Sequence, residues 1–274
     1  MAKLSFAHIA LPAKAIGRYR MGYIEARMAS EETERVPAAA VFLTADWRDL
    51  AMLNYEVDPG LLLSLVPHGT EFDTWNGRTF LSLVGFRFLN TRVRGIFLPF
   101  HRDFEEVNLR FYVRLREGKQ VKRGVVFIRE IVPRWLIAAA ARTFYNERYV
   151  ALPMSHRIEP DGSGRAVEYG WKFRTSKNKM RVTAKGTPLL PEGGSQEQFI
   201  TEHYWGYAAQ KDGGCMEYQV QHSPWKVWSV TDAVFEGDME KLYGRELNAV
   251  LKGPPTSAFL AEGSAVSVHR GRRL

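Results

Sequence analysis

The stretch from His101 to Arg114, HRDFEEVNLRFYVR, holds the side chains of this chain that are best suited to chemistry. Glu106, Asn108 and Arg110 alternate with apolar residues, which predicts a β-strand with two different faces. A carboxylate, an amide and a guanidinium in line can hold a small polar ligand. A buried carboxyl can also have a raised pKa and act as an acid or a base.

The direction of this polar face decides between two interpretations. Glu106 and Arg110 lie four positions apart, so the rise of a strand separates them by about 13 Å, and they would contact different parts of a ligand. Alternation by itself favours a solvent-facing strand with ordinary surface charges. In the other interpretation the polar face lines a cavity, and the strand is then a binding site.

Length and composition favour one large domain. The chain has 274 residues, 45% of them hydrophobic, which is enough to bury a core. We expect residues 1–37 to form a poorly ordered N-terminal extension and residues 38–274 to form a single domain. The formal charge of +8 comes from basic residues mixed with acids. No nucleic-acid-binding motif and no apolar run of membrane-spanning length occurs, so we expect neither partner, whereas a small anionic ligand suits the charge.

Several other kinds of site are excluded by the sequence. It has no glycine-rich phosphate loop, no HExxH or paired CxxC, and no GxSxG nucleophile elbow. The seven histidines are scattered, which is typical of ordinary hydrogen-bonded residues. We therefore expect no metal and no cofactor. The one cysteine, Cys215, lies in a KDGGC stretch that we interpret as a loop, and the lack of a possible internal disulfide favours a reducing, cytoplasmic location.

Strand-like runs greatly outnumber helical ones. They include AAAVFLTAD, MLNYEV, RTFLSLVGFRFLNTRV, RGVVFIREIV, AVEYGWKFR, KMRVTAKG, MEYQVQHSP, WKVWSVTDAVF and SAFLAEGSAVSVHRG. Asn76-Gly77 lies between two such runs and predicts a hairpin, and REGKQVK predicts another. Strands joined mostly by hairpins indicate an α+β fold that is mainly antiparallel β, curled into a barrel or sandwich with a few helices.

Helices are predicted at a few places by their starting residues. Asp58 is a good N-cap and Pro59 a good first residue for a short helix that ends near Pro67. A second helix begins at Pro133 and runs through RWLIAAAARTFYN. Ser195, followed three positions later by a glutamine, has the capping pattern of a third, and DMEKLYG indicates a short fourth.

The core of the chain resembles a family of uncharacterised bacterial proteins, the DUF2071 or YqjF-like family. The matching stretches run in order from Ala40 to the C-terminus and include WRDLAMLNYEVDP, LVPHGTEFDTWNG, FLSLVGFRF, PFHRDFEEVNLRFYVR, RGVVFIREIVPR, ARTFYNERY, EHYWGY, HSPW and FLAEGSAVSVHRG. This family is similar in turn to the acetoacetate decarboxylase-like superfamily. The resemblance implies a β-barrel with a central cavity, flanked by helices. It also places one of the cavity glutamates of those enzymes at Glu106, which favours the inward orientation.

The resemblance departs from the decarboxylases at their catalytic lysine. Those enzymes form a Schiff base between a lysine and a keto acid. The corresponding stretch here is FYNERY, residues 144–149, which contains no lysine. A guanidinium stays protonated and cannot replace the amine. Lys119 and Lys122 fall in a predicted hairpin loop and Lys172 is expected to face outward, so none of them is a convincing replacement.

Three functions remain open on this evidence. The first is an enzyme, with lyase or hydrolase activity, that acts on a small keto-acid-like anion without a Schiff base. Glu106 and Arg148 would then be catalytic, and the substrate would be bound by Asn108, Arg110, Asn146, Tyr149 and His101. The second is a ligand-binding or sensing protein without turnover, which the missing lysine favours.

A third function, as a structural subunit, uses aromatic surface for contacts in a homo-oligomer. Trp225 and Trp228 are the aromatic residues that suggest it. Because they lie three positions apart they point to opposite faces of a strand, so we expect at least one of them in the core.

Overall fold

The computed structural model describes residues 40–97, 99, 101–133, 148–161 and 164–274. The chain divides into two units, Met1–Ala39 and Ala40–Leu274, and every described residue belongs to the second. The extension predicted for residues 1–37 lies outside the described residues. The same holds for the body of the helix predicted from Pro133.

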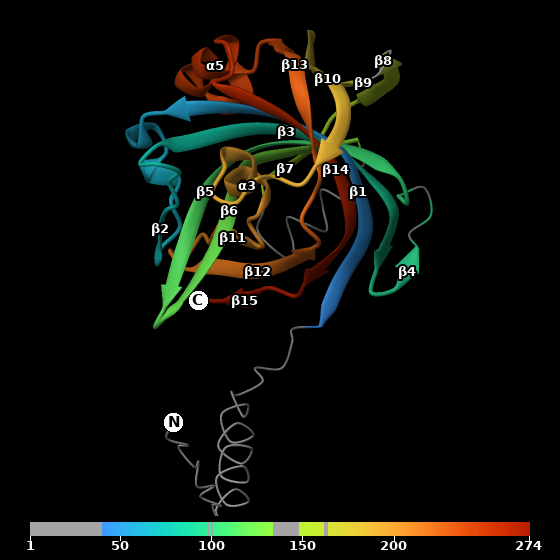
Figure 1. Ribbon diagram of the computed structural model, residues 1–274. Helices are drawn as coiled ribbons and strands as arrows, with labels where there is room; N and C mark the ends of the chain where they lie inside the picture. Colours follow the sequence, from blue (N-terminus) through green and yellow to red (C-terminus); the bar gives the residue numbers. More distant parts are fainter. Residues whose placement is uncertain (1–39, 98, 100, 134–147, 162–163) are drawn as a thin grey trace, which may run out of the picture. The chain divides into compact units, whose positions relative to one another are not determined.

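Fifteen strands of the described chain belong to one sheet (Figure 1). Most pairings are antiparallel, and the exceptions are β6 with β7 and β6 with β11. A mainly antiparallel β fold is therefore confirmed. The strands are β1 Val41–Val57, β2 Thr70–Phe72, β3 Thr79–Val93, β4 Ile96–Phe97, β5 Phe104–Glu117, β6 Gln120–Val132, β7 Tyr149–Ala151, β8 Met154–Asp161, β9 Gly164–Phe173, β10 Ser176–Leu189, β11 Trp205–Ala209, β12 Cys215–His222, β13 Val227–Glu236, β14 Ser257–His269 and β15 Arg272–Arg273.

Short helices connect some of the strands. The helix predicted after Asp58 is present as two 3-10 turns, and Asp58 caps the first by accepting a bond of 2.7 Å from the N–H of Gly60. The helix predicted after Ser195 is also confirmed, because Ser195 Oγ accepts from the N–H of Gln198 at 3.2 Å. The described helices are η1 Pro59–Leu61, η2 Leu63–Leu65, α3 Gln196–Thr201, α4 Glu240–Tyr243 and α5 Arg245–Lys252.

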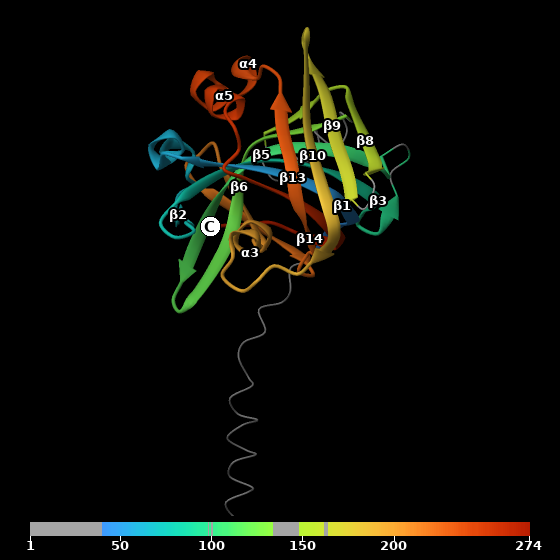
Figure 2. The ribbon, with the colours of Figure 1, turned by 45° about the horizontal axis from the view of Figure 1, so that its top comes forward.

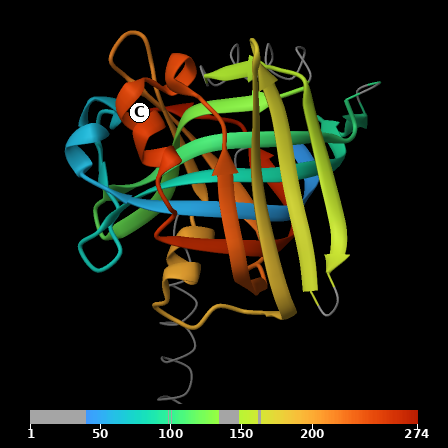
Figure 3. The ribbon, with the colours of Figure 1, turned by 90° about the horizontal axis from the view of Figure 1, so that it is seen from above.

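Seven strands form a closed ring of hydrogen-bonded neighbours, in the order β1, β3, β5, β6, β11, β12 and β14. We call this set the strand ring. It closes where β14 pairs with β1 along most of its length and with β12 through Val220–Val268, Gln221–Ser267 and His222–Val266. Strands β8, β9, β10 and β13 continue the sheet beyond the ring and lie side by side across it (Figures 2 and 3).

Two apolar clusters occupy the two faces of the ring strands. The outer cluster lies between the ring and the crossing strands, and from β5 it takes Val107, Leu109, Phe111 and Val113. The inner cluster lies on the opposite face, inside the ring, and includes aromatic residues of β3 and β5. Helix α3 contributes Phe199 and Ile200 to the inner cluster. The ring interior is thus largely filled with side chains, and its polar residues stand out against an apolar background.

The hairpin predicted at Asn76-Gly77 is wrong beyond the turn itself. Both residues have positive φ angles, 51° and 76°, and Trp75 and Arg78 exchange backbone hydrogen bonds of 3.1 and 2.9 Å. However, β2 pairs with β5, whereas β3 pairs with β1, β4 and β5. An Asn-Gly pair determines the local turn, but burial of the long apolar faces determines which strands become neighbours.

Two residues predicted to lie in loops are buried in strands. Cys215 is the first residue of β12 and is 1% exposed, because its side chain packs in the outer apolar cluster. Lys122 lies within β6 and is 7% exposed. The predicted β5–β6 hairpin is itself confirmed, with Glu117 opposite Gln120, and its turn is so short that Lys122 already belongs to the strand.

Candidate functional site

The polar face of β5 points into the strand ring. Glu106, Asn108 and Arg110 are 2, 1 and 7% exposed, so the solvent-facing interpretation is wrong. Strands β3 and β6 cover both edges of β5, and its alternate residues pack in the outer cluster. Strand alternation therefore directs these three side chains inward.

Glu106 is hydrogen-bonded to one neighbour on its own strand and to one from β7. Asn108 Nδ2 donates to Oε1 at 2.9 Å, and the Tyr149 hydroxyl donates to Oε2 at 3.2 Å. Burial is the largest influence on the pKa of Glu106 and raises it to about 7, although these bonds and the charge of Arg110 oppose it. A carboxyl with this pKa can give or take a proton near neutral pH.

A second buried acid, Glu130, lies next to Tyr149. Tyr149 pairs on β7 with Glu130 of β6, which is 2% exposed and lies opposite Asn108. Burial, followed by the charges of Glu106 and Glu130, raises the pKa of Tyr149 well above its usual value, so the phenol stays neutral. Glu130 is a site residue that sequence reasoning missed. Its signal is an acid within RGVVFIREIV, a strand whose residues 125–128 are apolar on both faces.

Arg110 is the cation of this interior, and it is incompletely partnered. It forms no ion pair or hydrogen bond with the described residues, and its Nε is buried without an acceptor among them. Its guanidinium carbon lies 5.8 Å from the ring centre of Tyr112, which is a weak cation–π contact. A buried guanidinium is costly unless something supplies the missing acceptors.

A small pocket adjoins Arg110 inside the ring. Its volume is about 30 Å³, which exceeds the roughly 10–15 Å³ that one water needs. Side chains from the inner faces of several ring strands and from the segment after α3 line it, among them Trp47, Arg110, His203, Tyr218, His222 and Trp225. Trp225 is 3% exposed, as expected for at least one member of the Trp225–Trp228 pair.

Two other predicted site residues, Arg148 and His101, do not join this group. Arg148 is exposed and lines a separate hollow with Val126 and Ile128 of the outer cluster. It therefore lies on the side of the sheet opposite to Tyr149, its neighbour in the chain. His101 is buried in the loop before β5, with Nδ1 2.6 Å from the carbonyl oxygen of Pro99. Asn146 lies outside the described residues.

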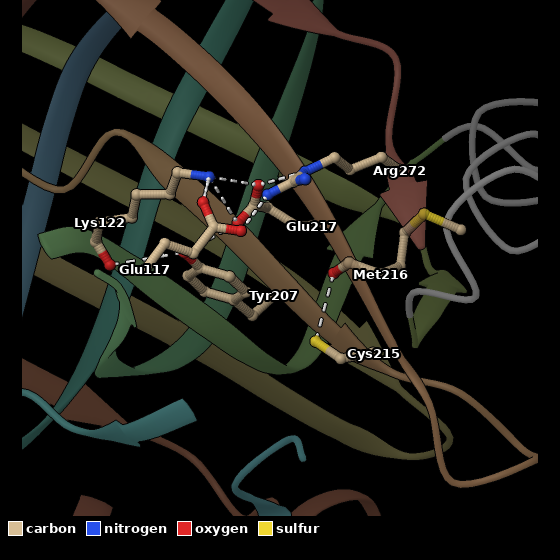
Figure 4. Close-up of polar contacts among 7 residues, drawn as sticks. All are labelled: Glu117, Lys122, Tyr207, Cys215, Met216, Glu217 and Arg272. Carbon is tan, nitrogen blue, oxygen red and sulfur yellow. Dashed lines mark hydrogen bonds and ion pairs between the residues drawn. The ribbon is translucent and has the colours of Figure 1, made fainter. Parts of the chain in front are cut away.

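Lys122 is the buried lysine of the described chain, and its amine is fully engaged. Its Nζ lies 3.1 Å from Glu217 Oε1 and 2.6 Å from Glu117 Oε2 (Figure 4). Arg272 of β15 donates to the same two acids, at 2.9 and 2.6 Å. Tyr207 donates to Glu217 at 3.4 Å and belongs to the outer apolar cluster. We call these five residues the charged cluster; it lies on the outer side of the ring.

Two kinds of feature are absent from the described residues. No three His, Cys, Asp or Glu side chains are grouped in a way that could hold a metal ion. No helix there has the length and apolar character needed to cross a membrane.

Solved structures identify the class of fold. An acetoacetate decarboxylase-like enzyme from Sphingomonas wittichii RW1 superposes with a TM-score of 0.59 at 11% identity, covering 86% of this chain and 94% of that one. Acetoacetate decarboxylase from Legionella pneumophila gives 0.59 at 13% identity, covering 90% and 94%. The enduracididine biosynthesis enzyme MppR, complexed with pyruvate, gives 0.60 at 12% identity, covering 88% and 93%. The chain therefore has an acetoacetate decarboxylase-like fold.

Sequence comparison identifies the family within that class. The model of DUF2071, described as an uncharacterized conserved protein, matches residues 44–265, and the chain belongs to this family. The uncharacterized protein YqjF of Bacillus subtilis (strain 168) is 29% identical over 194 residues, which cover 69% of this chain and 76% of that protein. The resemblance read from the sequence is confirmed at both levels.

Proposed function

We propose that this protein binds a small carboxylic acid inside the strand ring, which acts as a barrel with a polar interior. Arg110, which lines the pocket, pairs with the carboxylate of the ligand. Glu106, farther along the same inward face of β5, is the group that can give or take a proton. Asn108 and Tyr149 hold Glu106 in place. The observation that carries the proposal is the buried guanidinium of Arg110, which has no acid partner among the described residues and lines a pocket.

Two further observations support an anionic ligand at this position. Glu106 is protonated for much of the time at neutral pH, because burial raises its pKa to about 7, and a neutral carboxyl does not repel a carboxylate. The fold is also shared with MppR, whose solved structure contains pyruvate. A carboxyl that can transfer a proton, on the same inward strand face as the carboxylate-binding arginine, suits lyase or hydrolase chemistry.

Schiff-base chemistry is not part of this proposal. The buried lysine of the described chain, Lys122, lies outside the ring in ion pairs with Glu117 and Glu217. For the same reason, a second candidate function is binding or sensing without turnover. Product formation from a bound acid would favour the enzyme, and saturable binding without any product would favour the sensor.

The experiment is a calorimetric titration of the full chain with propionate at pH 6, where Glu106 is mostly protonated. Saturable binding is expected, and Arg110→Met should reduce it at least tenfold. Arg92→Met is the matched control, because Arg92 is an exposed arginine that stacks on Phe97 at the β3–β4 turn. Equal binding by wild type and Arg110→Met would contradict the proposal.

A further inference from the structure

His203 enters the ring interior directly after α3 and is held there by an acid. Its Nε2 lies 3.1 Å from Oδ2 of Asp73, which also accepts a bond of 2.6 Å from Nε of Arg123. Burial opposes ionisation of Asp73, but the bonds from His203 and Arg123 outweigh it, so the pKa of Asp73 is lowered. An ionised carboxylate can only accept hydrogen bonds, so the proton between the two residues lies on Nε2.

The other ring nitrogen of His203 is consequently an acceptor. Burial is the largest influence on the pKa of His203 and lowers it to about 4, so the imidazole is neutral at pH 7. A neutral imidazole protonated on Nε2 carries a lone pair on Nδ1. This Nδ1 is buried and receives no hydrogen bond from the described residues. Leaving such an acceptor unpartnered is costly, which suggests that something outside the described chain donates to it.

His203 and Arg110 line the same pocket. The ring of Tyr112 lies beside both, 4.7 Å from the His203 ring and 5.8 Å from the guanidinium carbon of Arg110. Of the residues that line the pocket, Arg110 therefore has a buried donor without a partner, Nε, and His203 has a buried acceptor without one, Nδ1. The molecule that complements it has an anionic acceptor next to a donor. The small volume favours a short molecule.

We propose that the ligand is a short hydroxycarboxylic acid, whose carboxylate pairs with Arg110 and whose hydroxyl donates to Nδ1 of His203. This inference rests on the proposed function and narrows it to a substrate class. A keto acid fits less well, because its carbonyl oxygen would meet the lone pair of Nδ1 with no proton between them. His203 then determines specificity, and Asp73 is a positioning residue that fixes its tautomer.

Three acids with one carbon skeleton test this choice. Calorimetric titrations at pH 7 with lactate (each enantiomer), pyruvate and propionate compare a hydroxyl, a carbonyl and a methylene at the same position. One lactate enantiomer is expected to bind at least tenfold more tightly than pyruvate and propionate, since a buried acceptor discriminates strongly against ligands without a donor.

Two substitutions assign the preference to one atom of His203. In His203→Gln the side-chain amide reaches the position of Nε2, so the bond to Asp73 can persist while Nδ1 is lost, and lactate should lose its advantage. In His203→Asn the amide lies near Nδ1, and part of the advantage should remain. His156→Gln is the matched control, because His156 is exposed and pairs with Glu105. Thermal unfolding shows whether each variant is folded.

The outcomes separate this inference from the proposed function. Equal binding of all the acids by the wild type, with loss in Arg110→Met, would overturn the hydroxyacid assignment and keep the carboxylate site. Failure of every acid to bind would overturn both. A lactate preference that survives in folded His203→Gln would overturn the role of His203. The wild-type comparison decides the ligand class even if the variants do not fold.

Discussion

The charged cluster and the polar face of β5 both bury charge in the same hairpin, β5 and β6, but they differ in how completely the charges are partnered. In the charged cluster Lys122 and Arg272 each contact Glu117 and Glu217. On the inner side Arg110 has no acid within ion-pair distance among the described residues. Buried charges that form ion pairs with each other are suited to a structural role, whereas a buried charge without an ion-pair partner in the protein is suited to binding a ligand.

The largest effect expected is in the charged cluster. Glu217→Ala leaves Lys122 buried with one acid, the partly exposed Glu117, and removes an acceptor of Arg272 and Tyr207. Breaking a buried pair from one side typically costs about 3–5 kcal/mol, so the free energy of unfolding should fall by that order. Urea denaturation followed by tryptophan fluorescence measures it. A loss below about 1 kcal/mol would remove the contrast between the two regions.

Glu106 should show the opposite pH dependence from an ordinary ion-paired acid. Its pKa is about 7 in the folded chain against an ordinary 4.5, so the folded state holds the proton more strongly. The resulting stability is full below pH 4.5 and is lost as the pH rises through 7, and it amounts to about 3 kcal/mol. In Glu106→Gln this slope should disappear. Denaturation of both proteins between pH 4 and pH 8 tests the prediction, and parallel curves would refute it.

Arg110→Met should separate stability from function. Methionine fills a similar volume and removes a buried charge that lacks a partner, so the variant is expected to be as stable as the wild type or about 1 kcal/mol more stable. Carboxylate binding should be lost at the same time. Strong destabilisation at pH 7 would mean that Arg110 is a structural residue like those of the charged cluster.

The smallest effect is expected at the rim of the charged cluster. The Arg272 side chain is 55% exposed, and Glu217 keeps its contact with Lys122 when Arg272 is changed to Ala. The free energy of unfolding should fall by less than about 1 kcal/mol, and the loss should shrink at high salt. A loss as large as that of Glu217→Ala would show that the arginine, not the lysine, neutralises this acid.

The sequence predicts where the strands of this fold lie more clearly than it predicts which strands pair with each other in the sheet. Alternation over residues 104–114 predicts β5, and Asn76-Gly77 predicts the turn before β3. Both predictions succeed because they depend only on residues that are adjacent in the chain. The direction of Glu106 and Arg110 depends on the closing of the ring by β14, more than a hundred residues later, so alternation alone could not decide it. The resemblance to the decarboxylase-like fold supplied that information for Glu106.

Residues whose environment the sequence did not predict, His203 and Lys122, also depend on contacts between distant parts of the chain. His203 becomes a candidate only through Asp73, which is 130 residues away in the chain. Lys122 was expected in a loop because the turn between β5 and β6 is shorter than predicted, and its partner Glu217 lies 95 residues away in the chain. Long-range pairs of this kind carry no periodic signal, and they are found only when the fold brings them together.

The closing of the strand ring also constrains how the protein is made. The first described strand, β1, has its partner β14 at residues 257–269, near the end of the chain. During synthesis on a ribosome the ring therefore stays open until β14 has emerged, and pairings at such separation form slowly. Through this time the inner faces of β3 and β5, with their aromatic residues and unpaired charges, are exposed to water. A nascent chain stalled before β14 is expected to be a substrate for chaperones and proteases, and the pocket beside Arg110 is complete only after β14 has closed the ring.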